Sequence, residues 1–117
     1  MHPDVEIIAH ERAGVVRFRE GAHVATFDWE FGGREVIVSI YVPAPAEWDA
    51  ELPWAAGRRT EILETLGREV RRQRCRGCGI EIAERWVNLT EPPRVPRVWH
   101  ALGRLIERWV GRAERAR

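Results

Sequence analysis

The stretch ATFDWEFGGREVIVSIYV, residues 25–42, decides the fold of this chain, because two β-rich runs meet in it at a pair of glycines. A Gly-Gly pair between apolar runs is typical of a two-residue hairpin turn, so we expect Gly32 and Gly33 to form the loop. Opposed residues of a hairpin share one face of the ribbon. The expected register puts three apolar pairs on one face: Trp29 opposite Val36, Phe27 opposite Val38, and Ala25 opposite Ile40. The pattern predicts a sheet with one apolar face, which another element has to cover.

The residues before this hairpin extend the same sheet. Two short runs, DVEIIA and VVRFRE, alternate as strands do, and Gly21-Ala22 is a second candidate for a tight turn. That turn puts two apolar pairs on the face that the first hairpin selects: Phe18 opposite Ala25, and Val16 opposite Phe27. Because two separate turn assignments agree on one face, we expect an antiparallel meander. Its strands are expected at about 4–9, 15–20, 24–31 and 34–42.

The clearest helix is predicted at about residues 54–74, where apolar residues recur at helical spacing. We expect this helix to pack on the apolar face of the sheet. One further strand is expected at about 80–87, where apolar and charged residues alternate again. The fold class is therefore α+β: an antiparallel β-meander, one helix packed on its apolar face, a further strand and a C-terminal amphipathic helix.

A proline-rich break, NLTEPPRVP at residues 88–96, precedes that last helix. Apolar residues then recur in steps of three and four along one side of the helix: Trp99, Leu102, Ile106, Trp109 and Ala113. We expect a core domain at residues 1–90 and a C-terminal segment at residues 91–117. The amphipathic helix needs a surface, which its own sheet, a second copy of the protein or a foreign partner would provide.

Length and charge bound the class of protein. The chain has 117 residues, which suits one domain, and all 19 of its basic residues are arginines. Residues 1–56 hold ten acidic and four basic side chains, whereas residues 57–117 hold eight and fifteen. This asymmetry favours complementary surfaces within the fold or across a dimer over a nucleic-acid patch. No apolar run approaches a membrane span and no secretory signal precedes the first strand, so we expect a cytoplasmic protein without membrane contact.

The sharpest motif is Cys75-Arg76-Gly77-Cys78. Two thiols at this spacing form half of a zinc site or a redox-active dithiol, or they are ordinary cysteines at a helix-to-strand corner. A zinc site needs two more ligands, and the sequence offers neither a second C-x-x-C nor paired histidines. A redox dithiol favours a helix N-terminus, whereas this motif follows a helix. The pattern favours ordinary cysteines, leaves Cys75 and Cys78 as weak metal candidates and indicates no cofactor.

Catalytic motifs are missing from the sequence, which contains no G-x-S-x-G, P-loop, H-E-x-x-H or G-x-G-x-x-G pattern. Glu30 and Glu35 are opposite each other in the expected hairpin, and paired carboxylates can perform acid–base chemistry. Their place beside a solvated turn favours ordinary surface carboxylates. An enzyme with a pocket between helix and sheet stays open, but we name no catalytic residue and favour a protein that is not an enzyme.

The six tryptophans are the most unusual feature, because Trp and Arg dominate the hot spots of protein interfaces. Trp48 and Trp54 lie on a connection, where they either close the core or stand out as binding anchors. The interaction candidates are Trp48, Trp54, Trp99, Leu102, Ile106, Trp109, Arg71 and Arg72. The leading hypothesis is a small protein-binding or adaptor domain that self-associates as a homodimer. The alternative is a metal-linked or nucleic-acid-binding regulator that uses the C-x-x-C motif and the arginines of residues 68–76.

Overall fold

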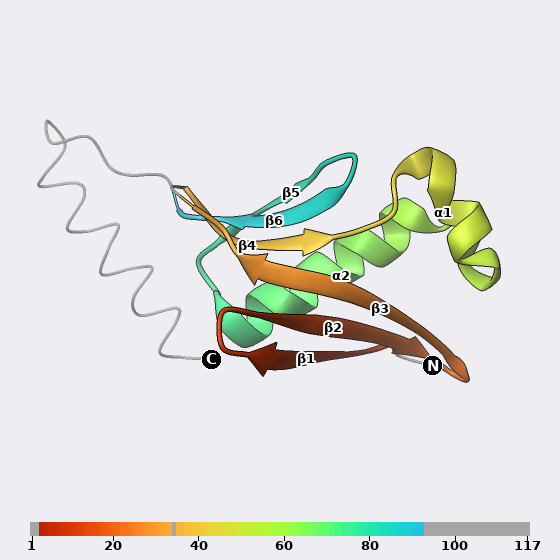
Figure 1. Cartoon of the computed structure of the whole chain (residues 1–117), viewed down its shortest axis with the longest axis horizontal. Coiled ribbons are helices and arrows are strands. Elements are labelled where there is room, and N and C mark those ends of the chain that lie inside the picture. The colour runs from red at the N-terminus through yellow and green to blue at the C-terminus, as the bar shows by residue number, and fades with distance from the viewer. Residues whose placement is uncertain (1–2, 34, 93–117) are drawn as a thin grey trace, which may run out of the picture.

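A computed structural model describes residues 3–33 and 35–92, which form a six-stranded antiparallel sheet and two α-helices (Figure 1). The elements in chain order are β1 (Asp4–His10), β2 (Ala13–Glu20), β3 (His23–Phe31), β4 (Val36–Tyr41), α1 (Pro45–Glu51), the 3₁₀ turn η1 (Pro53–Ala55), α2 (Arg59–Arg74), β5 (Gly79–Ile82) and β6 (Trp86–Thr90). The strands lie in the order β1-β2-β3-β4-β6-β5. The predicted α+β class with an antiparallel sheet is confirmed, and the predicted C-terminal helix lies outside the described residues.

The β2–β3 hairpin has the predicted register. Phe18 pairs with Ala25 and Val16 pairs with Phe27. Gly21 closes the turn with a φ of 61°, a backbone conformation that favours glycine over any residue with a side chain. A tight turn at position 21 therefore fixes this pairing.

The turn between β3 and β4 is wider than the sequence predicts. Trp29 pairs with Ile40, so the expected pairing of Trp29 with Val36 is wrong by four residues. The amide of Gly32, just past the end of β3, donates to the carbonyl oxygen of Ile37 at 2.9 Å. The amide of Val36 then closes a turn on the carbonyl oxygen of Gly33 at 3.2 Å.

The other pairings predicted for this hairpin are wrong for the same reason. Val38 pairs with Phe31 instead of Phe27, and Glu30 is opposite Ser39 instead of Glu35. Side chains alternate between faces along a strand, so an even shift leaves Trp29, Val38 and Ile40 on the predicted apolar face. The apolar face is therefore preserved although the register is not.

The region after β4 contains more structure than the sequence predicts. The stretch predicted as a connection, which carries Trp48 and Trp54, forms α1 and η1, and the long helix begins at Arg59 rather than near residue 54. The single strand expected at 80–87 is wrong, because β5 and β6 form a hairpin whose turn is closed by the amide of Ala83 on the carbonyl oxygen of Trp86 at 2.8 Å. β6 also continues through Thr90, into the stretch expected to be a linker.

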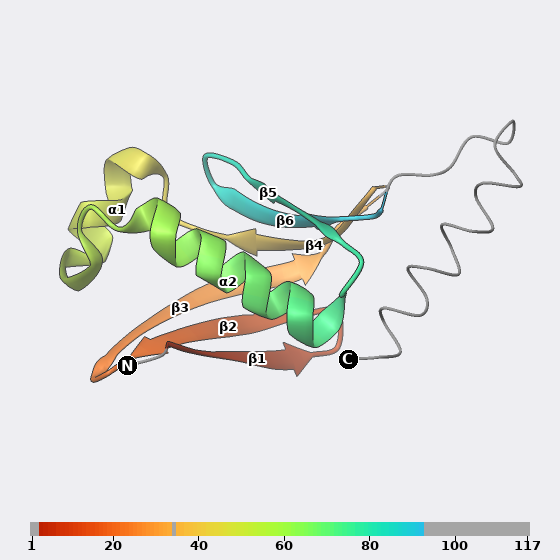
Figure 2. The same ribbon diagram turned by 180° about the vertical axis from the view of Figure 1, so that it is seen from behind.

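The buried side chains of α2 belong to the same core cluster as those of the sheet. They are Ile62, Leu63, Leu66 and Val70, and they join residues of the apolar face such as Phe18 and Phe27. The helix lies behind the sheet in Figure 1 and in front of it in Figure 2. Gly67 permits its close approach to β5, since a Cβ there would lie 2.9 Å from Cγ2 of Ile80.

Arg59 ties the start of α2 to two other segments. Its Nε donates to the carbonyl oxygen of Pro43 at 3.0 Å, and its Nη2 donates to those of Ala83 at 3.1 Å and Glu84 at 2.7 Å. Burial lowers the pKa of Arg59. One guanidinium thus joins α2 to the residues after β4 and to the β5–β6 turn.

Neither helix within the described ranges is long and apolar enough to cross a membrane.

Candidate protein-binding site

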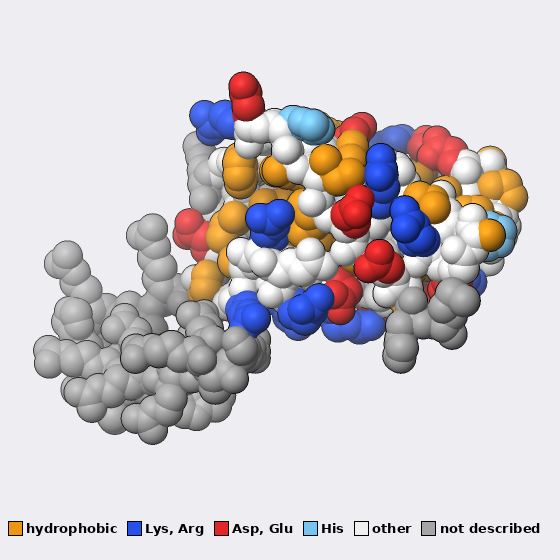
Figure 3. Space-filling model, turned by 90° about the horizontal axis from the view of Figure 1, so that it is seen from below, with side chains coloured by type: hydrophobic (Ala, Val, Ile, Leu, Met, Phe, Trp, Pro, Cys, Tyr) orange, Lys and Arg blue, Asp and Glu red, His pale blue; other side chains and the backbone are white. Residues whose placement is uncertain are grey.

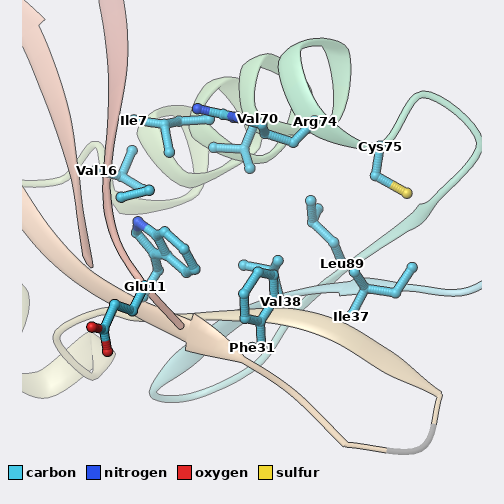
Figure 4. Close-up of a pocket in the computed structure, with 12 residues that line it drawn as sticks. Ile7, Glu11, Val16, Phe31, Ile37, Val38, Val70, Arg74, Cys75 and Leu89 are labelled. Atoms are coloured by element: carbon cyan, nitrogen blue, oxygen red, sulfur yellow. The ribbon is translucent and has the colours of Figure 1, made fainter. Parts of the chain in front are cut away.

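An apolar pocket opens at one end of the sheet (Figure 4). The ends of β1, β3, β6 and α2 surround it, together with the start of β4. We call it the end pocket. Its volume is about 220 Å³. It is lined by Ile7, Ala9, Glu11, Val16, Trp29, Phe31, Ile37, Val38, Val70, Arg74, Cys75 and Leu89. Hydrophobic side chains gather at this end of the molecule, on the left in Figure 3.

Phe31 is the unusual residue of the end pocket. It lies on the same face of β3 as Trp29, and the two rings meet edge to face with their centroids 5.4 Å apart. Trp29 is only 6% exposed and Val38, the strand partner of Phe31, is 9% exposed, but Phe31 itself is 48% exposed. An aromatic ring on the core face of the sheet is therefore half open to solvent.

The turn that follows α2 explains this exposure. The amide of Cys75 donates to the carbonyl oxygen of Arg71 at 2.9 Å, as the last helical bond, and the amide of Cys78 donates to that of Cys75 at 3.1 Å. A disulfide joins Cys75 to Cys78 across this turn. The chain leaves the helix here and enters β5, so α2 does not continue over Phe31.

The C-x-x-C motif thus lies at a corner between helix and strand, as predicted, and its disulfide was not anticipated. Cys75 lines the end pocket and Cys78 is buried in the core. Within residues 3–33 and 35–92, no group of three or more His, Cys, Asp or Glu side chains is placed to hold a metal ion.

Two exposed charged residues belong to the lining of the end pocket. Glu11 lies in the β1–β2 turn, and Figure 4 shows its carboxylate directed away from the open centre. Arg74 is the last residue of α2. The other lining side chains are aliphatic, aromatic or the disulfide sulfur of Cys75. Such a lining suits the binding of apolar side chains. Glu11 and Arg74 provide charges that could orient a bound segment.

The structure places the predicted candidates apart from one another. Trp48 is 1% exposed, and its indole N–H donates to the carbonyl oxygen of Ala55 at 2.9 Å, so it closes the core and presents no surface to a partner. Trp54 is partly buried and stacks on His23 at 4.9 Å. Since His23 begins β3 and Phe31 ends it, Trp54 and the end pocket lie at opposite ends of that strand.

The remaining candidates are the arginines of α2 and the C-terminal residues. Arg72 forms an ion pair with Glu69 at 2.9 Å, and this hydrogen bond raises the pKa of Arg72. Arg71 is half-buried beside it. Both line a shallow hollow of the helix surface together with Glu69, rather than the end pocket. The other candidates, Trp99, Leu102, Ile106 and Trp109, lie outside the described residues.

The end pocket was not predicted from the sequence, although Phe31 continues the apolar alternation of β3. Apolar residues alternate on the core face of β3 from Ala25 to Phe31, over seven residues or about 23 Å of strand. The 16 residues of α2 span about 24 Å, so length alone does not show which part of β3 stays uncovered. The alternation therefore places Phe31 on the apolar face, but whether this face is covered at Phe31 depends on where α2 ends, at Arg74.

The fold and the end pocket define a small α+β domain with an open apolar site at one end of its sheet. Comparisons of the chain with protein-family models, with curated proteins and with solved structures find no match. Its function is therefore argued from the site.

Proposed function

We propose that this protein is a non-enzymatic protein-binding domain, that its partner is a second copy of the chain, and that the end pocket is the contact. The observation that carries the proposal is Phe31, 48% exposed on the face that holds the core. Large aromatic side chains that contact a packed core on one side and water on the other are typical anchors of interfaces. Covering Phe31 removes apolar surface from water, which favours association.

The size of the end pocket supports a protein partner over a small molecule. Its volume of about 220 Å³ is below the roughly 300–1,000 Å³ of typical small-molecule sites. A pocket of this size takes one or two side chains, as in the recognition of an apolar helix face. We also propose that α2 packs across the apolar face of the sheet. This packing leaves the end pocket uncovered.

Native mass spectrometry and light scattering on the full chain test the proposal. We expect a dimer for the unmodified protein and a monomer for Phe31→Ser. Tyr41→Ser is the matched control, because Tyr41 is 43% exposed but lies on the opposite face of the sheet, and this variant stays dimeric. A monomeric unmodified protein, or a Phe31→Ser variant that still dimerises, contradicts the proposal. A mass increased by bound zinc would instead favour the metal-linked alternative.

A further inference from the structure

We infer that the C-terminal segment of the second copy, residues 93–117, is the element that fills the end pocket, so that two chains exchange these segments. The inference rests on the proposed function and names the part of the partner that binds. Four observations support it: the place where β6 ends, the pattern of the segment, its charge and its prolines.

Strand β6 ends beside the end pocket. Leu89 lines the pocket, and the next residue, Thr90, ends β6 between Val36 of β4 and Gly79 of β5. The amide of Glu91 then donates to the carbonyl oxygen of Glu35 at 2.8 Å. Figure 1 shows β6 ending at the same end of the sheet as β3. In a two-fold symmetric dimer built on end pockets, each C-terminal segment therefore starts next to the pocket of the other chain.

The segment carries the apolar pattern that such a pocket accepts. In a helix, residues at spacings of three and four share one side, and here they are Trp99, Leu102, Ile106 and Trp109. Recognition of a helix in a groove uses anchors at this spacing. The exposed ring of Phe31 offers an aromatic surface on which an indole can pack.

The charges of the two parts are complementary. Residues 1–92 hold 12 arginines and 16 acidic side chains, a net charge of −4. Residues 93–117 hold seven arginines and two acidic side chains, a net charge of +5. Opposite net charges speed the encounter of two surfaces and favour their association.

Prolines favour the second copy over the segment's own domain. Pro92, Pro93 and Pro96 follow the end of β6, and proline-rich backbone favours an extended form that advances about 3.1 Å per residue. Five residues in this form span about 15 Å, which gives the spacer before the amphipathic pattern the length to reach a pocket on a neighbouring copy. A stiff proline-rich spacer disfavours the sharp reversal that an immediate return to its own pocket would need, which favours exchange with a second copy. Exchange of a segment is a low-cost route to a closed dimer.

Photo-crosslinking in isotopically mixed dimers tests the inference. Unlabelled chain carrying Phe31→benzoylphenylalanine is unfolded and refolded with an equal amount of ¹⁵N-labelled unmodified chain, then irradiated and digested with trypsin. We expect crosslinks to labelled peptides from residues 98–112. Crosslinks to unlabelled peptides of this region alone show that the segment binds its own domain and overturn the exchange. A dimer without crosslinks to residues 98–112 overturns the inference and leaves the proposed function standing.

A pair of variants in the segment provides the second test. Trp109→Ala removes an apolar anchor, and we expect the dimer dissociation constant to rise roughly 30-fold, as for an interface hot spot. Arg104→Ala is the matched control on the opposite side of the helical pattern, with an expected change of less than about threefold. If Trp109→Ala leaves the dimer dissociation constant unchanged while Phe31→Ser is monomeric, the exchange of C-terminal segments is overturned but the proposed function is not. A monomeric unmodified protein overturns the proposed function as well.

Discussion

Trp29 donates its indole N–H to the main-chain carbonyl oxygen of Ile8 at 3.2 Å, and this bond joins β3 to β1 across the intervening β2. The bond passes over Gly14, which pairs with Trp29 on one side and with Ala9 on the other. Trp29 also lines the end pocket. Because Gly14 has no side chain, it leaves room for the hydrogen bond that holds the Trp29 indole in place there.

We predict that Gly14→Ala lowers the free energy of unfolding by about 2–3 kcal/mol. A Cβ at this position would lie 2.0 Å from the carbonyl oxygen of Ile8 and 2.9 Å from Nε1 of Trp29, so the main chain has to move and the indole bond is lost. Urea unfolding followed by tryptophan fluorescence measures the change. Gly33→Ala is the control, because nothing lies within 4 Å of its Cβ position, and we expect a change of no more than about 0.5 kcal/mol. Equal stabilities of the two variants would show that the close contact at Gly14 costs nothing.

The sheet illustrates what a sequence pattern determines. Phe18 and Ala25 could be paired in advance because a tight turn at Gly21 leaves a single register. The β3–β4 turn is wider and leaves several registers, all of which keep Trp29 on the apolar face if they differ by even steps. Face assignment therefore follows from alternation, whereas register follows from turn length.

The site was hidden from sequence analysis for a different reason. The exposure of Phe31 depends on where α2 ends, and no local pattern near residue 31 reports the end of a helix at residue 74. Trp48 shows the opposite case: it was a candidate for binding a partner, but it is buried in the core, where α1 and η1 surround it. The abundance of tryptophan therefore indicated core residues such as Trp48 rather than surface contacts.

Arg59 makes three hydrogen bonds to main-chain oxygens, and its replacement is predicted to be costly. Arg59→Ala should lower the free energy of unfolding by about 2 kcal/mol, since three carbonyl oxygens, two of them in part-buried hydrogen bonds, lose a charged donor. Arg59→Lys should recover only part of this loss, because an ammonium lacks the planar fork that reaches several oxygens. Arg68→Ala, on the exposed side of the same helix, should change stability by no more than about 0.5 kcal/mol in the same urea titration. Full stability of Arg59→Lys would refute the geometric argument.

Opening the Cys75–Cys78 disulfide should have a modest effect, because it closes a loop of only four residues. We predict a loss of about 2 kcal/mol in the free energy of unfolding on complete reduction. The double variant Cys75→Ser/Cys78→Ala should show the same loss and no further response to dithiothreitol, since alanine keeps the buried position 78 apolar. A thiol titration confirms reduction. If the reduced protein kept the stability of the oxidised one, the disulfide would not constrain the end of α2.

The last prediction concerns acid and the start of α2, at the end of the sheet away from the pocket. Arg58 holds both carboxylate oxygens of Glu20, with Nη1 to Oε1 at 2.8 Å and Nη2 to Oε2 at 2.9 Å. This hydrogen bonding lowers the pKa of Glu20 from its ordinary value of 4.5. The ionised carboxylate therefore stabilises the folded state above pH 4.5, and the stabilisation is lost as the pH falls through the lowered pKa of the folded protein.

Glu20→Gln should consequently be less stable than the unmodified protein at neutral pH, and the difference should shrink as the pH is lowered below 4.5. Urea unfolding of both proteins across this range measures the difference directly. Glu64→Gln, on the exposed surface of α2, controls for the removal of one negative charge and should show little difference at any pH. A difference between Glu20→Gln and the unmodified protein that stays constant into strong acid would mean that the Arg58 pairing does not depend on ionisation of Glu20.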